Sequence, residues 1–148
     1  MVVAALTLSA AGLVGIVAWE SYRGDAYLDS VGVPTIGFGT TDGVKMGDRI
    51  SVPVALDRAL KDTQKFEGAL KRCVAVPLHQ YEYDAYISFS YNVGASAFCA
   101  STLVRKLNEG DYASACAELS KWVYAGGQKL RGLVKRREQE RALCEGRM

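Results

Sequence analysis

Ligands for metal ions are scarce in this sequence. It has a single histidine, His79, and its four cysteines stand 26, 17 and 28 residues apart, with no CxxC pair. A structural zinc site needs several such ligands at short, characteristic spacings. The sequence therefore gives no support to a metal centre, and we expect neither a metal nor an organic cofactor.

Charge is missing from the first 19 residues, MVVAALTLSAAGLVGIVAW, and Glu20 is the first ionisable side chain. This length is close to the minimum for a membrane-spanning helix. The run is only weakly apolar, however, because it is rich in Ala and Gly, and no Lys or Arg precedes it. Three interpretations stay open: a cleaved signal peptide, a buried helix of a soluble domain, and an uncleaved signal anchor.

Repeats, low-complexity tracts and a second domain are also missing. The 148 residues suit one domain, and 49% hydrophobic with 23% charged residues excludes a disordered chain. The net charge of +2 is too small to indicate nucleic acid, although seven basic residues lie from Lys129 onward. That end either attracts a polyanion such as the cell wall or is a solvated helix face.

The cysteines form an even, well-spread set. Such a set fits two disulfides in an oxidising compartment, whereas four buried thiols would fit a cytosolic protein. The uncharged N-terminus favours export and therefore disulfides. Four cysteines allow three pairings, which the sequence leaves open. We favour Cys73–Cys99 and Cys116–Cys144, since we expect the segments that they join to pack together.

Helical patterns follow a short strand pattern along the chain. We expect strands at 26–28 and 35–38 around a turn at 29–33, and then helices over 51–73, 79–91, 101–110, 111–125 and 130–143. The predicted fold class is α+β, mainly helical, with a small β-hairpin lobe and an active-site cleft between lobes.

Three residues near the hairpin carry groups that can cleave a glycosidic bond. Glu20 follows the apolar run, Asp29 falls at the turn and Thr35 on the returning strand. One carboxyl group can protonate the leaving oxygen, and a second can position water or attack. Spacing alone is a weak signal, because Glu20 also suits a helix end and Asp29 a turn.

The residues around these positions resemble the active-site segment of phage-type lysozymes, glycoside hydrolase family 24. The family pattern of Glu, eight residues, Asp or Cys, five residues and Thr matches Glu20, Asp29 and Thr35. Further matches follow in order at Tyr91-Asn92-Val93-Gly94, Ser101-Thr102-Leu103, Gly110-Asp111-Tyr112, Trp122, Tyr124-Ala125-Gly126-Gly127 and Arg136-Arg137-Glu138. The resemblance covers residues 20–144, with one departure: Thr40 stands where the family commonly has His.

The resemblance implies a lysozyme-like fold and an N-acetylmuramidase that inverts the anomeric centre. Glu20 would be the general acid, with Asp29 and Thr35 positioning water, and Arg137 is a candidate partner of Glu20. Candidate sugar contacts are Tyr91, Asn92, Phe98 and Ser101. The expected partner is peptidoglycan, with no nucleic acid and a monomeric enzyme.

Some members of the family carry a signal-anchor-release segment, and residues 1–19 resemble such a segment. We therefore expect two parts, residues 1–19 as an anchor that can join the fold as a helix and residues 20–148 as the catalytic domain. The enzyme would be exported by a Gram-negative host, tethered to the inner membrane and then released into the periplasm. The rival functions are a small anchored membrane protein, a cationic binding module and a transglycosylase.

Overall fold

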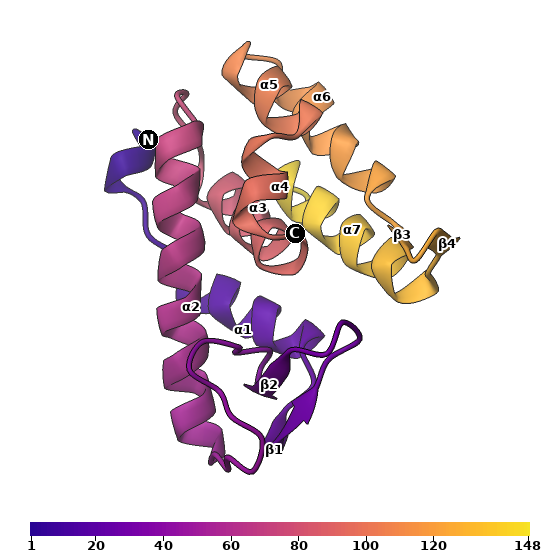
Figure 1. Ribbon diagram of the computed structural model, residues 1–148. Coiled ribbons are helices and arrows are strands. Elements are labelled where there is room, and N and C mark those ends of the chain that lie inside the picture. The colour runs from indigo at the N-terminus through magenta and orange to yellow at the C-terminus, as the bar shows by residue number, and fades with distance from the viewer. The chain divides into compact units, whose positions relative to one another are not determined.

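The computed structural model describes residues 1–148 and divides them into two compact units. The first, which we call the body, comprises Met1–Gly12 and Phe66–Met148. The second, which we call the hairpin unit, comprises Leu13–Lys65. Two helices run through both units, α1 (Ala10–Trp19) and α2 (Val52–Cys73), and Figure 1 labels them.

The body is built from short helices. After the 3-10 turn η1 at Val3–Ala5, it contains α3 to α7 and the 3-10 turn η2 (Figure 1). Their bounds are α3 Gln80–Val93, α4 Ala95–Cys99, α5 Thr102–Asn108, α6 Tyr112–Glu118, η2 Leu119–Lys121 and α7 Arg131–Cys144. Side chains cap the starts of α5 and α6, where Ser101 accepts from the Val104 N–H and Asp111 accepts from the Ser114 N–H.

An aromatic core fills the space between α3 and its neighbours. The rings of Tyr86, Phe89 and Phe98 are fully buried, and Phe98 lies 6.1 Å from each of the other two, centroid to centroid. Disulfides join Cys73 to Cys99 and Cys116 to Cys144, the pairing favoured from the sequence. Both bridges therefore lie within the body.

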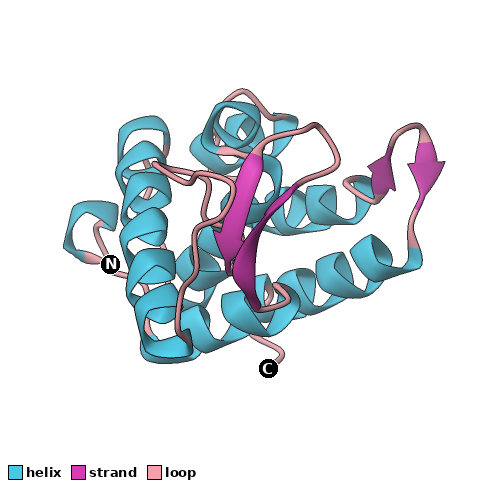
Figure 2. Ribbon diagram, turned by 60° about the horizontal axis from the view of Figure 1, so that its bottom comes forward, coloured by secondary structure: helices cyan, strands magenta, loops and turns pink.

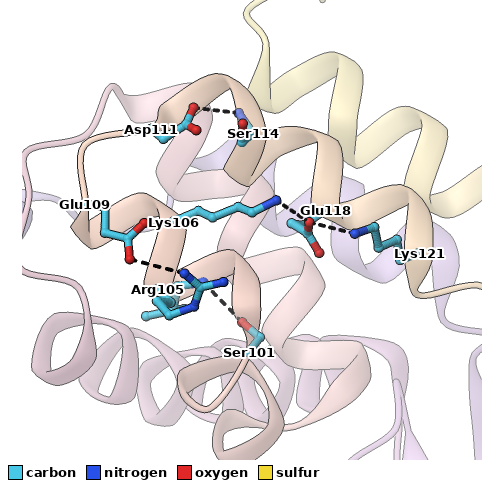
Figure 3. A network of polar contacts seen from close by, with 9 residues as sticks. Ser101, Arg105, Lys106, Glu109, Asp111, Ser114, Glu118 and Lys121 are labelled. Atoms are coloured by element: carbon cyan, nitrogen blue, oxygen red, sulfur yellow. Dashed lines mark hydrogen bonds and ion pairs between the residues drawn. The ribbon is translucent and has the colours of Figure 1, made fainter.

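Charged groups are also buried in the body. Arg136, Arg137 and Glu140 of α7 are each at most 5% exposed, and the Glu140 carboxylate pairs with both arginines. A second cluster is drawn in Figure 3, where Glu118 accepts from Lys106 at 2.6 Å and from Lys121 at 2.9 Å. These pairs connect α5, α6 and η2.

The hairpin unit holds the antiparallel strands β1 (Arg23–Leu28) and β2 (Pro34–Gly37), seen in magenta in Figure 2. Thr35 lies opposite Tyr27 in the ladder, and the register shifts between Arg23 and Tyr27. Behind the strands, Phe38 packs with Ala55 and Ala59 of α2. The mainly helical α+β class with a small hairpin sheet is therefore confirmed.

Two parts of the body differ from the prediction. The helix expected from Asp111 to residue 125 ends at Glu118, and a second hairpin follows, with β3 at Tyr124–Ala125 and β4 at Gln128–Lys129. Gly126 and Gly127 both have positive φ, 57° and 77°, as a tight two-residue hairpin turn requires. The glycine pair is thus the turn of a hairpin and not a helix stop. The short helix α4 was not expected.

No helix in the chain combines the length and the apolar character that crossing a bilayer requires.

Candidate active site

Glu20 follows α1 directly. The helix ends at Trp19, and the Glu20 N–H donates to the Ile16 carbonyl oxygen at 3.3 Å, which closes the last turn. Both Trp19 and Glu20 are half-buried. The Glu20 carboxyl therefore stands on a rigid helical end, three residues before β1 begins.

Asp29 organises the turn between the two strands. Its Oδ1 accepts from the Val31 N–H at 2.9 Å and from the Val33 N–H at 2.8 Å, while its own N–H donates to the Val33 oxygen at 3.0 Å. One carboxylate oxygen thus fixes the turn, which leaves Oδ2 as the oxygen available for chemistry. The turn and catalytic roles considered for Asp29 are compatible in one side chain.

Thr35 lies on β2 and is 4% exposed. Its hydroxyl donates to the Val33 carbonyl oxygen at 2.9 Å. Because that bond uses the only proton of the hydroxyl, the oxygen lone pairs remain to accept a hydrogen bond from water or substrate. Glu20, Asp29 and Thr35 accordingly lie on three consecutive segments of the same unit.

The segment after Thr35 is fixed to α2. Ile36 and Thr40 exchange two backbone hydrogen bonds of 2.9 and 3.0 Å, and the Thr40 hydroxyl donates to Asp62 Oδ2 at 2.6 Å. Gly37 has φ of 66°, and a Cβ there would lie 3.0 Å from the Ala55 Cβ. Thr40, which departs from the family pattern, therefore serves as a buried link between the strand that carries Thr35 and α2.

The four predicted sugar contacts all lie in the body. Phe98 is fully buried in the aromatic core, and Ser101 is 9% exposed, with its hydroxyl used to cap α5. Tyr91 is half-buried and lies 5.3 Å from the Phe66 ring, and Asn92 is exposed. Packing and capping thus explain Phe98 and Ser101, whereas Tyr91 and Asn92 retain surface that a sugar can contact.

Arg137 is held within the body by all three of its nitrogens. Nε donates to the Trp122 carbonyl oxygen at 2.9 Å, and the two terminal nitrogens donate to Glu140 and to the Asn92 side-chain oxygen. Burial lowers the pKa of the guanidinium from its ordinary value, and Glu140 opposes that shift. These bonds give Arg137 a structural role, and its pairing with Glu20 stays a prediction.

Sequence reasoning missed two sets of polar residues. One is the Thr40–Asp62 pair, for which Thr40 itself was the available signal. The other is a group of side chains on α2 and α3 that binds the backbone of residues 7–9. No local sequence pattern predicts the second group, because its hydrogen bonds join residues that are 59 to 75 positions apart.

Comparison with known proteins gives consistent results. The family model named Phage lysozyme matches residues 17–140. An endolysin of Acyrthosiphon pisum secondary endosymbiont phage 1 is 41% identical over 142 residues, which covers 93% of this chain and 97% of that protein. A SAR-endolysin of Pseudomonas phage phiKMV is 41% identical over 139 residues, covering 91% and 86%.

A solved structure agrees over nearly the same span. A mutant of P22 lysozyme superposes with a TM-score of 0.84 at 38% identity, covering 95% of this chain and 99% of that one. The residues matched by the family model, 17–140, include Glu20, Asp29 and Thr35.

Proposed function

Since this chain belongs to the phage lysozyme family and is a muramidase of the endolysin type, we propose that it hydrolyses the β-1,4 bond between N-acetylmuramic acid and N-acetylglucosamine in peptidoglycan. The observation that carries the proposal is the placement of Glu20, Asp29 and Thr35 on the end of α1, the hairpin turn and β2 of one unit. Host cell lysis would follow from cutting the wall.

Glu20 acts as the general acid in this proposal. It stands beside Trp19 on a helix end and gives its proton to the glycosidic oxygen as the bond to the muramic acid anomeric carbon breaks. Asp29 Oδ2 carries negative charge towards the oxocarbenium-like centre, and the Thr35 hydroxyl accepts a hydrogen bond from the attacking water. Water supplies the oxygen of the new hemiacetal, and the proton that it loses passes to the Asp29 carboxylate.

Inversion of the anomeric centre is the stereochemical outcome that we propose. It needs carboxyl groups about 6.5–9.5 Å apart, so that water fits between the second carboxylate and the sugar. Proton NMR of the first product formed from a defined oligosaccharide reports the anomer directly. An initial product with retained configuration would contradict this step.

Tyr91 and Asn92 are the proposed sugar contacts on the body. A half-buried ring and an exposed amide suit stacking on a sugar and bonding to its hydroxyl or acetamido groups. Phe98 and Ser101 would support these two residues from the core and from the start of α5. No metal or cofactor takes part in the proposed reaction, and the enzyme acts as a monomer.

The decisive experiment is Glu20→Gln in a turbidity assay on purified peptidoglycan. Loss of a general acid should lower the rate by at least about 100-fold. Asp25→Asn is the matched control, because Asp25 is an exposed β1 carboxylate paired with Arg49 in the same unit. A Glu20→Gln protein that still clears peptidoglycan at the wild-type rate would exclude this function.

Membrane release is the second part of the proposal. Residues 1–19 would tether an inactive enzyme to the inner membrane until depolarisation frees it into the periplasm, while residues 20–148 form the catalytic domain. Support comes from the uncharged, Ala- and Gly-rich composition of this run and from the similarity to a SAR-endolysin. Insertion would keep Glu20 at the bilayer edge, away from Asp29 and Thr35.

Gly15→Leu tests the release step. Gly15 is exposed on α1 with no atom within 4 Å of an added Cβ, so the fold accepts the change, while added hydrophobicity strengthens insertion. The variant should stay in the membrane fraction after depolarisation and lyse cells late. Lysis on the wild-type schedule would contradict the release mechanism.

A further inference from the structure

The N-terminal run is not one continuous helix. Residues 6–9 separate η1 from α1 and have no helical structure. In an unbroken α-helix, the N–H groups of Leu8, Ser9 and Gly12 would bond to the carbonyl oxygens four residues earlier. In this structure all three donate elsewhere, and side chains of the body receive two of them.

Glu67 of α2 receives the first of these groups. Its Oε1 accepts from the Leu8 N–H at 2.6 Å and from the Tyr83 hydroxyl at 2.8 Å. Tyr83 is fully buried, and burial together with the Glu67 bond raises the pKa of its phenol above the ordinary value. The phenol therefore keeps its proton and orients Glu67 towards residue 8.

Asp84 of α3 receives Ser9 through both carboxylate oxygens. Oδ1 accepts from the Ser9 N–H at 3.1 Å, and Oδ2 accepts from the Ser9 hydroxyl. That hydroxyl in turn accepts from the Gly12 N–H at 2.9 Å, the bond of a helix N-cap. Asp84 is 6% exposed, so the Ser9 donors satisfy oxygens that little water can reach.

Gln80 completes the contacts with a bridge. Its side-chain nitrogen donates to the Thr7 carbonyl oxygen at 2.8 Å and to Asp84 Oδ1 at 2.9 Å. One side chain of α2, Glu67, and two that lie one turn apart on α3, Gln80 and Asp84, thus bind residues 7–9 of the N-terminal run. We call the group of Glu67, Gln80, Tyr83 and Asp84 the Asp84 socket.

Gly12 lies so close to Asp84 and Leu8 that there is no room for a side chain at this position. A Cβ on Gly12 would lie 2.7 Å from the Leu8 Cδ1 and 2.9 Å from the Asp84 Cγ, closer than real Cβ contacts come. Gly15, one turn later on the same helix, faces open space. Only the glycine that lies against Asp84 is therefore required by the packing.

We propose that the Asp84 socket is the binding site that captures residues 7–12 after they leave the membrane, an inference that rests on the release mechanism proposed above. In a membrane-spanning helix, the N–H groups of Leu8 and Ser9 would donate to carbonyl oxygens of the same helix. In the socket they donate to Glu67 and Asp84 instead, so the inserted and captured states exclude each other. It recognises the chain by its backbone at residues 7–9, by the Ser9 hydroxyl and by the absence of a side chain at position 12.

Capture exchanges one set of hydrogen bonds for another and does not simply break them. The helix bonds lost at Leu8 and Ser9 are exchanged for bonds to carboxylates, which are stronger than neutral ones. The helix that remains begins at the Ser9 cap, and it leads directly to Glu20. The socket therefore determines where α1 starts and, through α1, supports the segment that carries the catalytic acid.

The test uses the full-length protein purified without detergent and measures amide hydrogen exchange by NMR. Asp84→Asn and Ser9→Ala should each speed exchange at Leu8, Ser9 and Gly12 by about 10- to 100-fold, the loss of a charge-assisted hydrogen bond. The effect of the double variant should be smaller than the sum of the two single effects, because the bond between the Ser9 hydroxyl and Asp84 is common to both changes. Exchange at Val104 in α5 should stay unchanged.

Glycine variants give a matched pair. Gly12→Ala should open residues 7–12 to exchange, whereas Gly15→Ala on the same helix should leave them protected. If Asp84→Asn disturbs α3 as a whole, Ser9→Ala still decides, since it alters only the captured run. Unchanged exchange in Ser9→Ala and Gly12→Ala, or equal opening by Gly15→Ala, would overturn the proposal.

A membrane experiment separates this inference from the release mechanism. Before depolarisation, Ser9→Ala should fractionate with membranes like wild type; afterwards it should gain less muramidase activity. If wild-type protein never associates with membranes, the release mechanism and capture both fail, while the exchange data still show whether the socket holds residues 7–12. Full activity of Ser9→Ala after depolarisation, with wild-type membrane association, would overturn capture alone.

Discussion

The two units differ in how deeply their best-buried ion pairs lie. In the body, Glu140 and its two arginines are almost fully buried, and the Glu118 side chain is 6% exposed between two lysines. In the hairpin unit, the Arg49–Asp25 and Lys61–Asp57 pairs are mostly exposed. Exposed pairs add little stability, whereas a broken buried pair leaves a desolvated charge. The body thus contains buried ion pairs, while the hairpin unit presents the proposed catalytic groups at a helix end, in a turn and on a short strand.

The largest expected effect is on the body. Glu140→Gln removes the carboxylate that pairs with the buried Arg136 and Arg137 and should lower the free energy of unfolding by about 3–5 kcal/mol. Urea denaturation measures it. Glu145→Gln, which alters a more exposed carboxylate just beyond the end of α7, is the control and should change it by less than about 1 kcal/mol. If Glu140→Gln and Glu145→Gln lowered the free energy of unfolding equally, the proposed difference between buried and exposed ion pairs would be wrong.

The disulfide near the same helix comes next. Replacing Cys116 and Cys144 with Ala opens a 28-residue loop and should cost about 3–4 kcal/mol on the chain-entropy estimate. Removing Cys73 and Cys99, with a 26-residue loop, should cost nearly the same. In both variants the loss should fall on the body, which hydrogen exchange can localise. A larger loss of protection in residues 13–65 would contradict this assignment.

The third effect concerns the buried hydrogen bond from Thr40 to Asp62, which links β2 to α2 in the hairpin unit. Thr40→Val removes the donor to Asp62 and should cost about 1–3 kcal/mol, with a fall in kcat because β2 carries Thr35. Thr40→Ser keeps the hydroxyl and should recover most of both losses. Arg49→Ala, which breaks an exposed pair in the same unit, should leave kcat unchanged. A Thr40→Val enzyme with normal kcat would show that the link is only structural.

The smallest expected effect is a change in thermal stability that appears only at acidic pH. Hydrogen bonds from Lys106 and then from Lys121 lower the pKa of Glu118 below its ordinary value of 4.5 (Figure 3). Because the folded-state pKa is depressed, the stabilisation is complete above about pH 4.5 and is lost as pH falls through the folded pKa. The Tm of wild type should therefore drop more steeply below pH 4.5 than that of Glu118→Gln. Parallel curves would show that this cluster adds nothing.

Much of the fold follows from local patterns. The structure places a helix at Val52–Cys73, close to the predicted 51–73, because its apolar stripe, start signals and length are all local properties. Asp29 and Pro34 likewise indicate the turn and the strand entry. The β3–β4 hairpin was missed since two-residue strands carry no periodicity, and a Gly-Gly pair fits a helix stop and a hairpin turn equally well.

The candidate site was predicted for a different reason. Glu20, Asp29 and Thr35 were identified by resemblance, because their spacing alone is common. The Asp84 socket could not be found this way, since its bonds join distant segments through backbone groups that any residue type provides. Sequence reveals which side chains are present, and only the fold reveals which backbone groups they meet.

The order of the two disulfides along the chain has a mechanical consequence. They close separate, successive loops, of 26 and 28 residues, and leave the first 72 residues outside both. A force applied to the two ends of the oxidised protein could therefore extend residues 1–72 completely, the hairpin unit included. The two loops would withhold about 190 Å of contour length until a reductant opened them. Single-molecule stretching would record that length as a step that appears only under reducing conditions.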